Sequence, residues 1–425
     1  MQDTILLVSI PKLLKKYHQI NLTLLDQIMV SGVNFLTGIL FARFLGIEEF
    51  GRFTLVWMAV LFLNSIQMAL IISPMMSMAP IQASQDKAEY FGAVVCQQIC
   101  FSFLSLMLIL GGVKLSVIYY PEWEINHLAL PLSMVVFFFQ NQDFFRRFFF
   151  IKERHLFALV NDAISYLGQI ILLLILFQTT KLNLYNILWI IAFTSAFAVL
   201  ISFFLIGNIV WPKYSFFKSF FQKNWNFAKW LIASSLLQWT SGNYFIIVGG
   251  YLLGPVAVGT VKAMQTVVGI TQIIYQAMEN FLPSRSSQIH LLEGEKGLIR
   301  YLIKVIIIGG SFVGSILLLI TLFSENLLSF LYGVEYTQYN YLMIWISIIS
   351  LIGYIGLPIG SALRTIEQTG SIFFSFLLST IVSFLIAHFL IYSLGIDGIV
   401  IGILLAKLIL IGSMGFFLSI RLKQK

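Results

Sequence analysis

Two arginines and two glutamates stand close together in the segment ARFLGIEEFGRF, residues 42–53, which lies between long apolar runs. Arg43 and Arg52 could bind an anionic group, because guanidinium groups form charge-assisted hydrogen bonds to phosphate and carboxylate oxygens. Glu48 and Glu49 are typical of a solvated turn, and the two glycines of the segment permit a tight connection. What Arg43 and Arg52 can do therefore depends on the solvent around the rest of the chain.

The composition identifies that solvent as a lipid bilayer. Of the 425 residues, 59% are hydrophobic and 10% are charged, whereas soluble domains have about 45–50% apolar and about 25% charged residues. Apolar runs of about 20 residues without period-two alternation predict membrane-spanning helices rather than strands. We expect an all-α polytopic fold of twelve spans, near residues 22–45, 53–79, 90–111, 128–147, 157–178, 185–210, 229–252, 256–282, 300–323, 339–362, 371–394 and 398–419.

The positive charges predict how these spans cross the membrane. Twenty of the 26 Lys and Arg residues lie at one side of the predicted spans, four lie at the other side, and Lys262 and Lys407 lie inside spans. Positive loops favour the cytoplasm, so both termini are predicted to be cytoplasmic. The net charge of +8 is then a signal of topology, and we expect no nucleic-acid partner.

The two halves of the chain show a weak internal repeat. A shift of 208 residues places Leu45-Gly46 on Leu253-Gly254 and Gly51 on Gly259. Six spans per half make the repeat parallel, with an axis along the membrane normal and a substrate site expected between the halves. The predicted domains are an amphipathic cytoplasmic segment at 1–21, a lobe of helices 1–6 at 22–210, an amphipathic cytoplasmic connector at 211–228, and a lobe of helices 7–12 with a short tail at 229–425.

A polar block in the fourth predicted span is the second candidate for chemistry. Four polar residues, Gln140, Asn141, Gln142 and Asp143, precede Arg146 and Arg147 in the run FFFQNQDFFRRFF. Contact with lipid would penalise these side chains, so they could face a water-filled cavity and bind substrate. Alternatively, the helix ends near residue 140 and the block is cytoplasmic.

Other charged residues lie within or beside predicted spans. Asp26 and Asp162 are expected at the starts of helices 1 and 5, where carboxylates favour the helix dipole. Asp26 and Glu279 could also couple transport to an ion gradient. Lys262, near the external end of helix 8, could contact an anionic substrate or extend towards the headgroups. Lys407 is a further cation within a span.

The first 170 residues resemble a known family. Asp26, the run SGVNF, the Ala-Arg-x-Leu-Gly run at 42–46 and EEFG at 48–51 are similar to the opening of bacterial polysaccharide and O-antigen flippases of the multidrug/oligosaccharidyl-lipid/polysaccharide exporter superfamily. The segment FFRRFFFIKERHLFALVNDAISYLGQ at 144–169 is similar to that family's basic loop between helices 4 and 5. The second half carries no strong motif of the family.

The resemblance implies outward movement of an undecaprenyl-diphosphate-linked oligosaccharide across the bacterial inner membrane by alternating access, for lipopolysaccharide, O-antigen, capsule or exopolysaccharide synthesis. Its partners would be the lipid-linked substrate and membrane lipids, and could include a polysaccharide polymerase and a chain-length regulator.

A multidrug exporter of the same superfamily is the alternative, and would favour buried carboxylates for cationic substrates. A membrane polymerase or glycosyltransferase would need a catalytic constellation in a large loop. The chain offers none, so we expect a protein that is not an enzyme and has no cofactor or metal.

Overall fold

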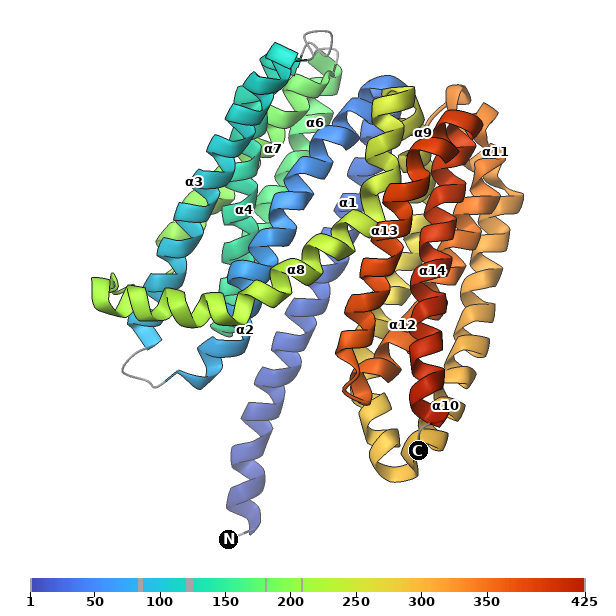
Figure 1. Ribbon diagram of the computed structural model, residues 1–425. Helices are drawn as coiled ribbons and strands as arrows, with labels where there is room; N and C mark the ends of the chain where they lie inside the picture. The colour runs from blue at the N-terminus through green and yellow to red at the C-terminus, as the bar shows by residue number, and fades with distance from the viewer. Residues whose placement is uncertain (1, 83–86, 120–124, 180–181, 208, 424–425) are drawn as a thin grey trace. The chain divides into compact units, whose positions relative to one another are not determined.

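The structure is a computed structural model that describes residues 2–82, 87–119, 125–179, 182–207 and 209–423, with their side chains except at 2–20, 117, 119, 179, 422 and 423. In these residues all regular secondary structure is helical (Figure 1). The chain divides into two compact units. The first comprises Met1–Thr37 and Val56–Ala233, and the second comprises Gly38–Leu55 and Ser234–Lys425. The all-α prediction is confirmed.

The helices follow one another with few long connections. Those up to the middle of the chain are α1 (Gln2–Gln67), α2 (Ser73–Met78), α3 (Lys87–Tyr119), α4 (Ala129–Ile151), α5 (His155–Asp162), α6 (Gly168–Thr179) and α7 (Leu184–Leu205). They are followed by α8 (Tyr214–Leu253), α9 (Pro255–Val268), α10 (Gln272–Leu322), α11 (Ser324–Leu331), α12 (Leu342–Thr365), α13 (Thr369–Leu394) and α14 (Ile396–Lys423). In the first unit α4 contacts α3, α5 and α7, and in the second α12 contacts α9, α10, α13 and α14.

Eight helical stretches of the described residues are long and apolar enough to cross a membrane. Two of them, Asn21–Ile81 and Pro255–Leu322, are 61 and 68 residues long, which is enough for two passes each at about 20 residues per pass. Gly46 interrupts the first and Gly294 the second with positive φ angles of 74° and 67°. A multi-pass membrane protein is therefore confirmed, and the count of twelve spans stays a prediction.

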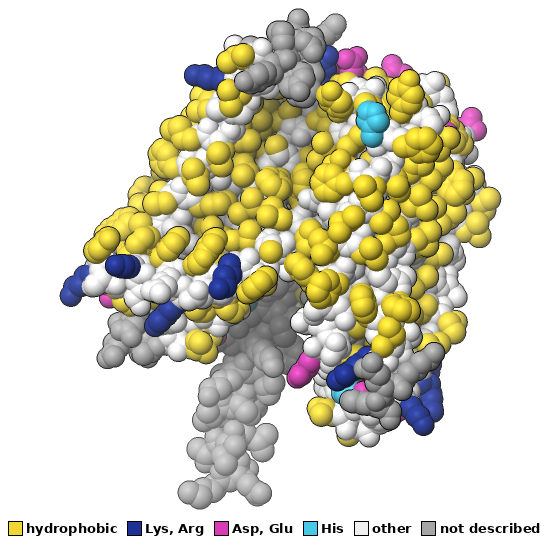
Figure 2. All heavy atoms as spheres, in the orientation of Figure 1, with side chains coloured by type: hydrophobic (Ala, Val, Ile, Leu, Met, Phe, Trp, Pro, Cys, Tyr) yellow, Lys and Arg dark blue, Asp and Glu magenta, His cyan; other side chains and the backbone are white. Residues whose placement is uncertain are grey.

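Helix α13 shows why this fold requires lipid. It buries small polar residues, including Ser379 and Ser383, and exposes Phe384, Leu385 and Phe389 at 53%, 75% and 72%. In water this arrangement would leave large apolar side chains solvated, whereas in a bilayer lipid covers them. The buried hydroxyls bond within the protein, since Ser379 donates to the carbonyl of Ala406 at 2.9 Å. Hydrophobic side chains also dominate the faces visible in Figure 2.

Several connections differ from the predicted ones. The gap expected between residues 282 and 300 is largely helical, because α10 stays helical on both sides of Gly294, whose non-helical backbone (φ 67°, ψ −164°) alone separates two helices. The external break expected at 324–338 contains α11 and a 3-10 segment, Val334–Tyr339. The predicted equivalence of Gly46 and Gly254 is confirmed locally, since both have left-handed φ angles, 74° and 84°.

The predicted connector at 211–228 is largely the first half of α8, which continues without a break to Leu253. Its aromatic face was expected on lipid headgroups. Instead, Phe220 is buried in the core of the first unit, with Phe216 and Phe217 packed against the same cluster, while Trp225 is 47% exposed. Tertiary packing buries this part of the face because it continues an existing aromatic core. The two faces predicted for residues 1–21 fall mainly on side chains outside the described set.

Candidate functional site

A buried ion cluster joins three helices of the first unit. The guanidinium of Arg146 lies 2.8 Å from Asp26 Oδ2 through Nη2 and 2.6 Å from Asp162 Oδ2 through Nε. The side chain of Arg146 is 14% exposed, and those of Asp26 and Asp162 are 1% and 0% exposed. Two carboxylates therefore share one cation in a buried site, where charges persist only if they are paired.

The positions of these residues correct two sequence interpretations. Asp26 lies inside α1, and Asp162 is the last residue of α5, so neither carboxylate caps a helix start. The alternative in which the fourth helix ends near residue 140 is wrong as well, because α4 continues to Ile151 and carries Arg146 inside the fold. Pairing between helices, rather than a helix dipole, holds the two carboxylates.

Amide side chains extend this cluster. Gln142 Nε2 donates to Asn161 Oδ1 and to Asp162 Oδ1, both at 2.7 Å. Asn161 in turn donates to the Ser202 hydroxyl at 2.6 Å. Gln142 and Asp162 are 0% exposed, so this network orders the interior between α4, α5 and α7 and fixes the direction of the Asp162 carboxylate.

A second amide chain lies between α1, α3 and α4. Gln67 Nε2 donates to Gln98 Oε1 at 3.0 Å and to the carbonyl of Gln140 at 2.8 Å, and Asn141 donates to the Ser102 hydroxyl at 3.0 Å. Gln67 and Asp162 each precede a π-helical turn, Met68–Ile72 and Ala163–Leu167. Such turns are frequent at functional sites.

The remaining polar residues of α4 lie closer to the surface of the unit. Asp143 Oδ2 accepts a hydrogen bond from Arg147 Nε at 3.0 Å, and the two side chains are 13% and 27% exposed. By contrast, Gln140 is 0% and Asn141 5% exposed. The structure thus places the amides of the predicted polar block inside the first unit, and Arg147 at its edge.

The two arginines of the hairpin segment lie in the second unit and have different partners. Arg43 Nη1 donates to the carbonyl of Phe330 at 2.9 Å, near the C-terminus of α11. Arg52 pairs with Glu48 at 3.0 Å and with Glu49 at 3.4 Å on one exposed helical face. Arg52 therefore has two exposed acidic neighbours, and Arg43 links α1 to α11.

Three further charges lie in predicted spans of the second unit. Lys262 on α9 and Lys407 on α14 are half-buried. Within the described residues, neither ammonium group has a hydrogen-bond or ion-pair partner. Glu279 on α10 is exposed. The ammonium groups of Lys262 and Lys407 therefore lie in membrane-spanning helices without an acidic partner among the described side chains.

The sequence interpretation missed part of the buried cluster. Asp162 and Asn161 were not among the predicted site residues, although each interrupts an apolar run, and Gln142 was noted only as part of the polar block. Polar residues inside predicted spans, where contact with lipid is costly, are the signal that points to them. Among the described residues, no group of three or more His, Cys, Asp or Glu side chains is arranged to hold a metal.

Membrane-spanning helices that enclose a buried ion cluster define a polytopic membrane protein. The chain belongs to the family described as polysaccharide biosynthesis protein, whose model matches residues 18–283. The predicted resemblance is confirmed. A comparison with curated proteins gave no match.

Solved structures share the fold. An inward-facing multidrug resistance MATE family transporter of the MOP superfamily has a TM-score of 0.74 at 12% identity, over 94% of this chain and 95% of its own. Lipid II flippase MurJ in an inward closed conformation has a TM-score of 0.61 at 16% identity, over 95% of this chain and 87% of its own. A mutant of the Vibrio cholerae MATE transporter VcmN has a TM-score of 0.63 at 15% identity, over 97% of this chain and 98% of its own. At these identities the likeness concerns the fold alone.

Proposed function

We propose that this protein is an inner-membrane flippase that moves undecaprenyl-diphosphate-linked oligosaccharide units outward by alternating access, for surface polysaccharide synthesis. The family, named for polysaccharide biosynthesis, supports the substrate class. A flippase of a lipid-linked precursor, Lipid II flippase MurJ, is among the proteins that share the fold. Both termini are cytoplasmic in this proposal, so a cysteine at position 222 should resist labelling from outside while one at position 48 reacts.

The observation that carries the proposal is the pair of lysines in the second unit. Lys262 and Lys407 are half-buried in membrane-spanning helices and have no acidic partner among the described residues. Intramembrane cations are costly, and such residues mark pathways for substrates and ions. A diphosphate is a ligand that supplies the missing negative charge.

The predicted site residues take separate roles in this proposal. Arg43, Arg52 and Lys262 attract the diphosphate, and Arg147, near Asp143, offers a further cation at the surface of the first unit. Gln140, Asn141 and Arg146 order the interior of that unit. Asp26, which shares Arg146 with Asp162, is the candidate for ion coupling, because two carboxylates and one guanidinium leave one negative charge for a proton or cation.

A multidrug exporter remains the second candidate function. It is favoured by the MATE transporters that share the fold and by the buried carboxylates of Asp26 and Asp162. The guanidinium of Arg146 forms ion pairs with both carboxylates, however, and this weakens their attraction for a cationic drug.

One experiment separates the two functions. The gene is deleted in its native host, and surface polysaccharide and sensitivity to cationic dyes are both measured. Loss of polysaccharide with accumulation of its lipid-linked precursor, at unchanged dye sensitivity, supports the flippase. Intact polysaccharide together with increased dye sensitivity would establish the exporter instead.

A further inference from the structure

A polar stripe runs along α9 and the first turns of α10. It consists of Lys262, Gln265, Gly269, Gln272 and Gln276, which follow one another at alternating intervals of three and four residues. Such intervals place residues on one face of a helix. A 3-10 segment, Gly269–Thr271, joins the two helices inside the stripe. All five residues lie in the candidate membrane span Pro255–Leu322, so a polar face lies within a membrane-spanning stretch.

The polar stripe lies on the side of α9 that the second unit buries least. Ala263, Met264 and Val267, on the other side of the helix, are buried among the described residues. Lys262 and Gln265 are half-buried. The apolar side of α9 therefore supplies its packing, and the polar stripe is left for other contacts.

The glutamines of the polar stripe lie deep in the membrane. Gly254 forms the turn between α8 and α9, and taking this turn as one edge of the membrane gives the depth of each residue. At about 1.5 Å per residue, Gln265 lies about 16 Å from the turn and Gln272 about 27 Å, whereas the hydrocarbon core is about 30 Å thick. Gln265 is therefore near the midplane, where transporters built from two such halves typically bind their substrates.

Two of these glutamines have no hydrogen-bond partner among the described residues. The side chains of Gln265 and Gln272 bond to none of them, whereas the hydroxyl of the neighbouring Thr266 donates to the carbonyl of Lys262 at 2.9 Å. An amide in contact with lipid at this depth would lose its hydrogen bonds to water without replacement, which is costly. A polar ligand or water is therefore expected beside Gln265 and Gln272.

The groups of the polar stripe match a sugar better than a phosphate or a cation. An amide both donates and accepts hydrogen bonds, as a hydroxyl does, whereas an ionised phosphate mainly accepts them and a cation requires negative charge. Residues 262–276 include no acidic residue. Since Lys262 and Gln265 are neighbours on one face, with Cβ atoms about 5–6 Å apart, a diphosphate at the lysine places the sugar bonded to it beside Gln265.

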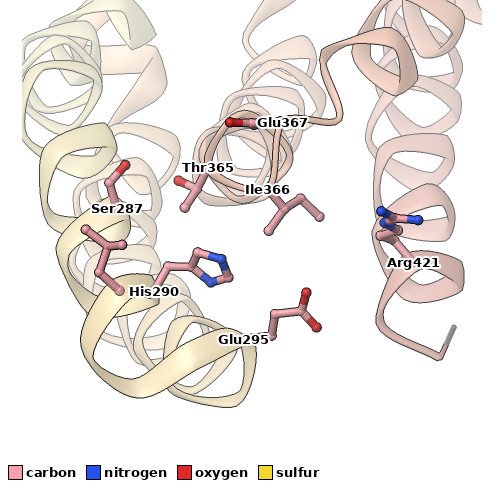
Figure 3. Close-up of a pocket in the computed structure, with 8 residues that line it drawn as sticks. Ser287, His290, Glu295, Thr365, Ile366, Glu367 and Arg421 are labelled. Atoms are coloured by element: carbon pink, nitrogen blue, oxygen red, sulfur yellow. The ribbon is translucent and has the colours of Figure 1, made fainter. Parts of the chain in front are cut away.

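The same helix reaches a different environment further along the chain. Beyond the polar stripe, α10 borders a cavity of about 460 Å³ whose lining includes Glu295, Glu367 and Arg421 (Figure 3). Ionisable groups of both signs would have to give up water for a neutral sugar without gaining a charge partner. This end of α10 is therefore not expected to bind the saccharide, and it provides a control position.

We propose that the polar stripe binds the saccharide of the lipid-linked substrate, with Gln265 and Gln272 forming hydrogen bonds to sugar hydroxyls while Lys262 contacts the diphosphate. This proposal rests on the flippase function and names residues that set its sugar preference. Gln265 and Gln272 are about 10 Å apart along the helix, so they contact different sugars of one oligosaccharide.

The test measures binding of two probes to the full-length protein in lipid nanodiscs. One probe is undecaprenyl diphosphate, and the other is the undecaprenyl-diphosphate-linked oligosaccharide prepared from membranes of the native host. Gln265→Leu and Gln272→Leu should each weaken binding of the oligosaccharide probe about two- to ten-fold, as the loss of one net hydrogen bond predicts, and leave binding of undecaprenyl diphosphate unchanged. Lys262→Ala should weaken binding of both probes. Gln288→Leu is the matched control, because this exposed glutamine of α10 accepts a hydrogen bond from Arg285 outside the polar stripe, and it should bind both probes as wild type does.

Thermal unfolding in detergent shows that the variants are folded. The unfolding temperatures of Gln265→Leu and Gln272→Leu should equal or exceed that of wild type, since leucine is favoured in a span. A wild-type preference for the oligosaccharide probe that persists in both glutamine variants would overturn the saccharide assignment and leave the flippase function standing. Equal weakening of both probes in these variants would overturn the assignment as well. Wild-type protein that binds neither probe would refute the flippase function, and the proposal with it.

Discussion

Gly51 and Gly259 pack against each other's helices through reciprocal contacts in the second unit. A Cβ on Gly51 would collide with the carbonyl oxygen of Pro255, and a Cβ on Gly259 would collide with the carbonyl oxygen of Ile47. Ile47 and Pro255 are themselves related by the 208-residue shift that relates the two glycines. The same contact is therefore made in both directions, as a local two-fold axis requires.

The first prediction concerns this contact. Gly51→Ala or Gly259→Ala should destabilise the protein by about 1–3 kcal/mol, because an added methyl group must push two backbones apart. Gly242→Ala is the control, since its Cβ would meet no atom within 4 Å, and it should be neutral or stabilising by about 0.5–1 kcal/mol. Thermal unfolding in detergent measures all three. Equal behaviour of Gly51→Ala and Gly242→Ala would contradict the close contact.

The second prediction concerns the buried ion cluster. Arg146→Ala should cost about 3–5 kcal/mol, because it leaves Asp26 and Asp162 as buried carboxylates without a cation. Arg147→Ala, the neighbouring residue on α4, removes a more exposed pair and should cost about 1 kcal/mol or less. Arg146→Gln combined with Asp26→Asn should recover part of the loss. Unfolding temperatures and membrane accumulation of the four proteins are the measurement, and similar losses for both arginines would refute the assignment.

The third prediction separates transport from stability. Lys262→Ala should lower polysaccharide export more than about ten-fold, if the ammonium supplies a charge contact of about 1.5–3 kcal/mol to the diphosphate. Its unfolding temperature should stay the same or rise, since no described side chain pairs with this cation. Lys262→Arg should retain part of the activity, and Lys114→Ala, an exposed control on α3, should retain all of it. Full export by Lys262→Ala would remove this lysine from the site.

The fourth prediction compares the charges of the hairpin segment. Arg43→Ala should abolish export while the protein still accumulates in the membrane, and Arg43→Lys should recover part of it, because an ammonium keeps the charge without the guanidinium fork. Glu48→Gln should be nearly silent, since its exposed pair with Arg52 contributes about 0–1 kcal/mol. The measurement is polysaccharide export by each variant at matched expression levels. A fully active Arg43→Ala would leave its hydrogen bond to Phe330 as a structural link only.

The fifth prediction concerns pH and Lys152, in the connection after α4. Burial, together with the charges of Arg154 and Lys87, lowers the pKa of Lys152 to about 8. Since the unfolded chain keeps its proton up to about pH 10.4, the unfolded state binds more protons between these values, and stability rises with pH there. The unfolding temperature of wild type relative to Lys152→Met should therefore increase from pH 7 to pH 10. A constant difference would contradict the lowered pKa.

Much of the architecture was predictable because lipid imposes simple rules on a sequence. Runs of about 20 apolar residues must be helical, and this alone predicts the helices that surround Gly46 and Gly254. The shift pairs these two glycines, and the structure gives them a shared left-handed conformation. This pattern could not predict the path of the chain between spans, so a longer loop was expected where the structure has only the non-helical Gly294 between two helices.

The sequence by itself determined the solvent, the helical class and the family resemblance, because these depend on composition and on short runs of neighbouring residues. Only the tertiary structure decided the partners of the charges. Asp26, Arg146 and Asp162 lie on three different helices, and no local pattern distinguishes a carboxylate at a helix start from one held by a guanidinium of another helix. Pairing energy depends on distance and burial in three dimensions, and those quantities exist only once the helices have packed.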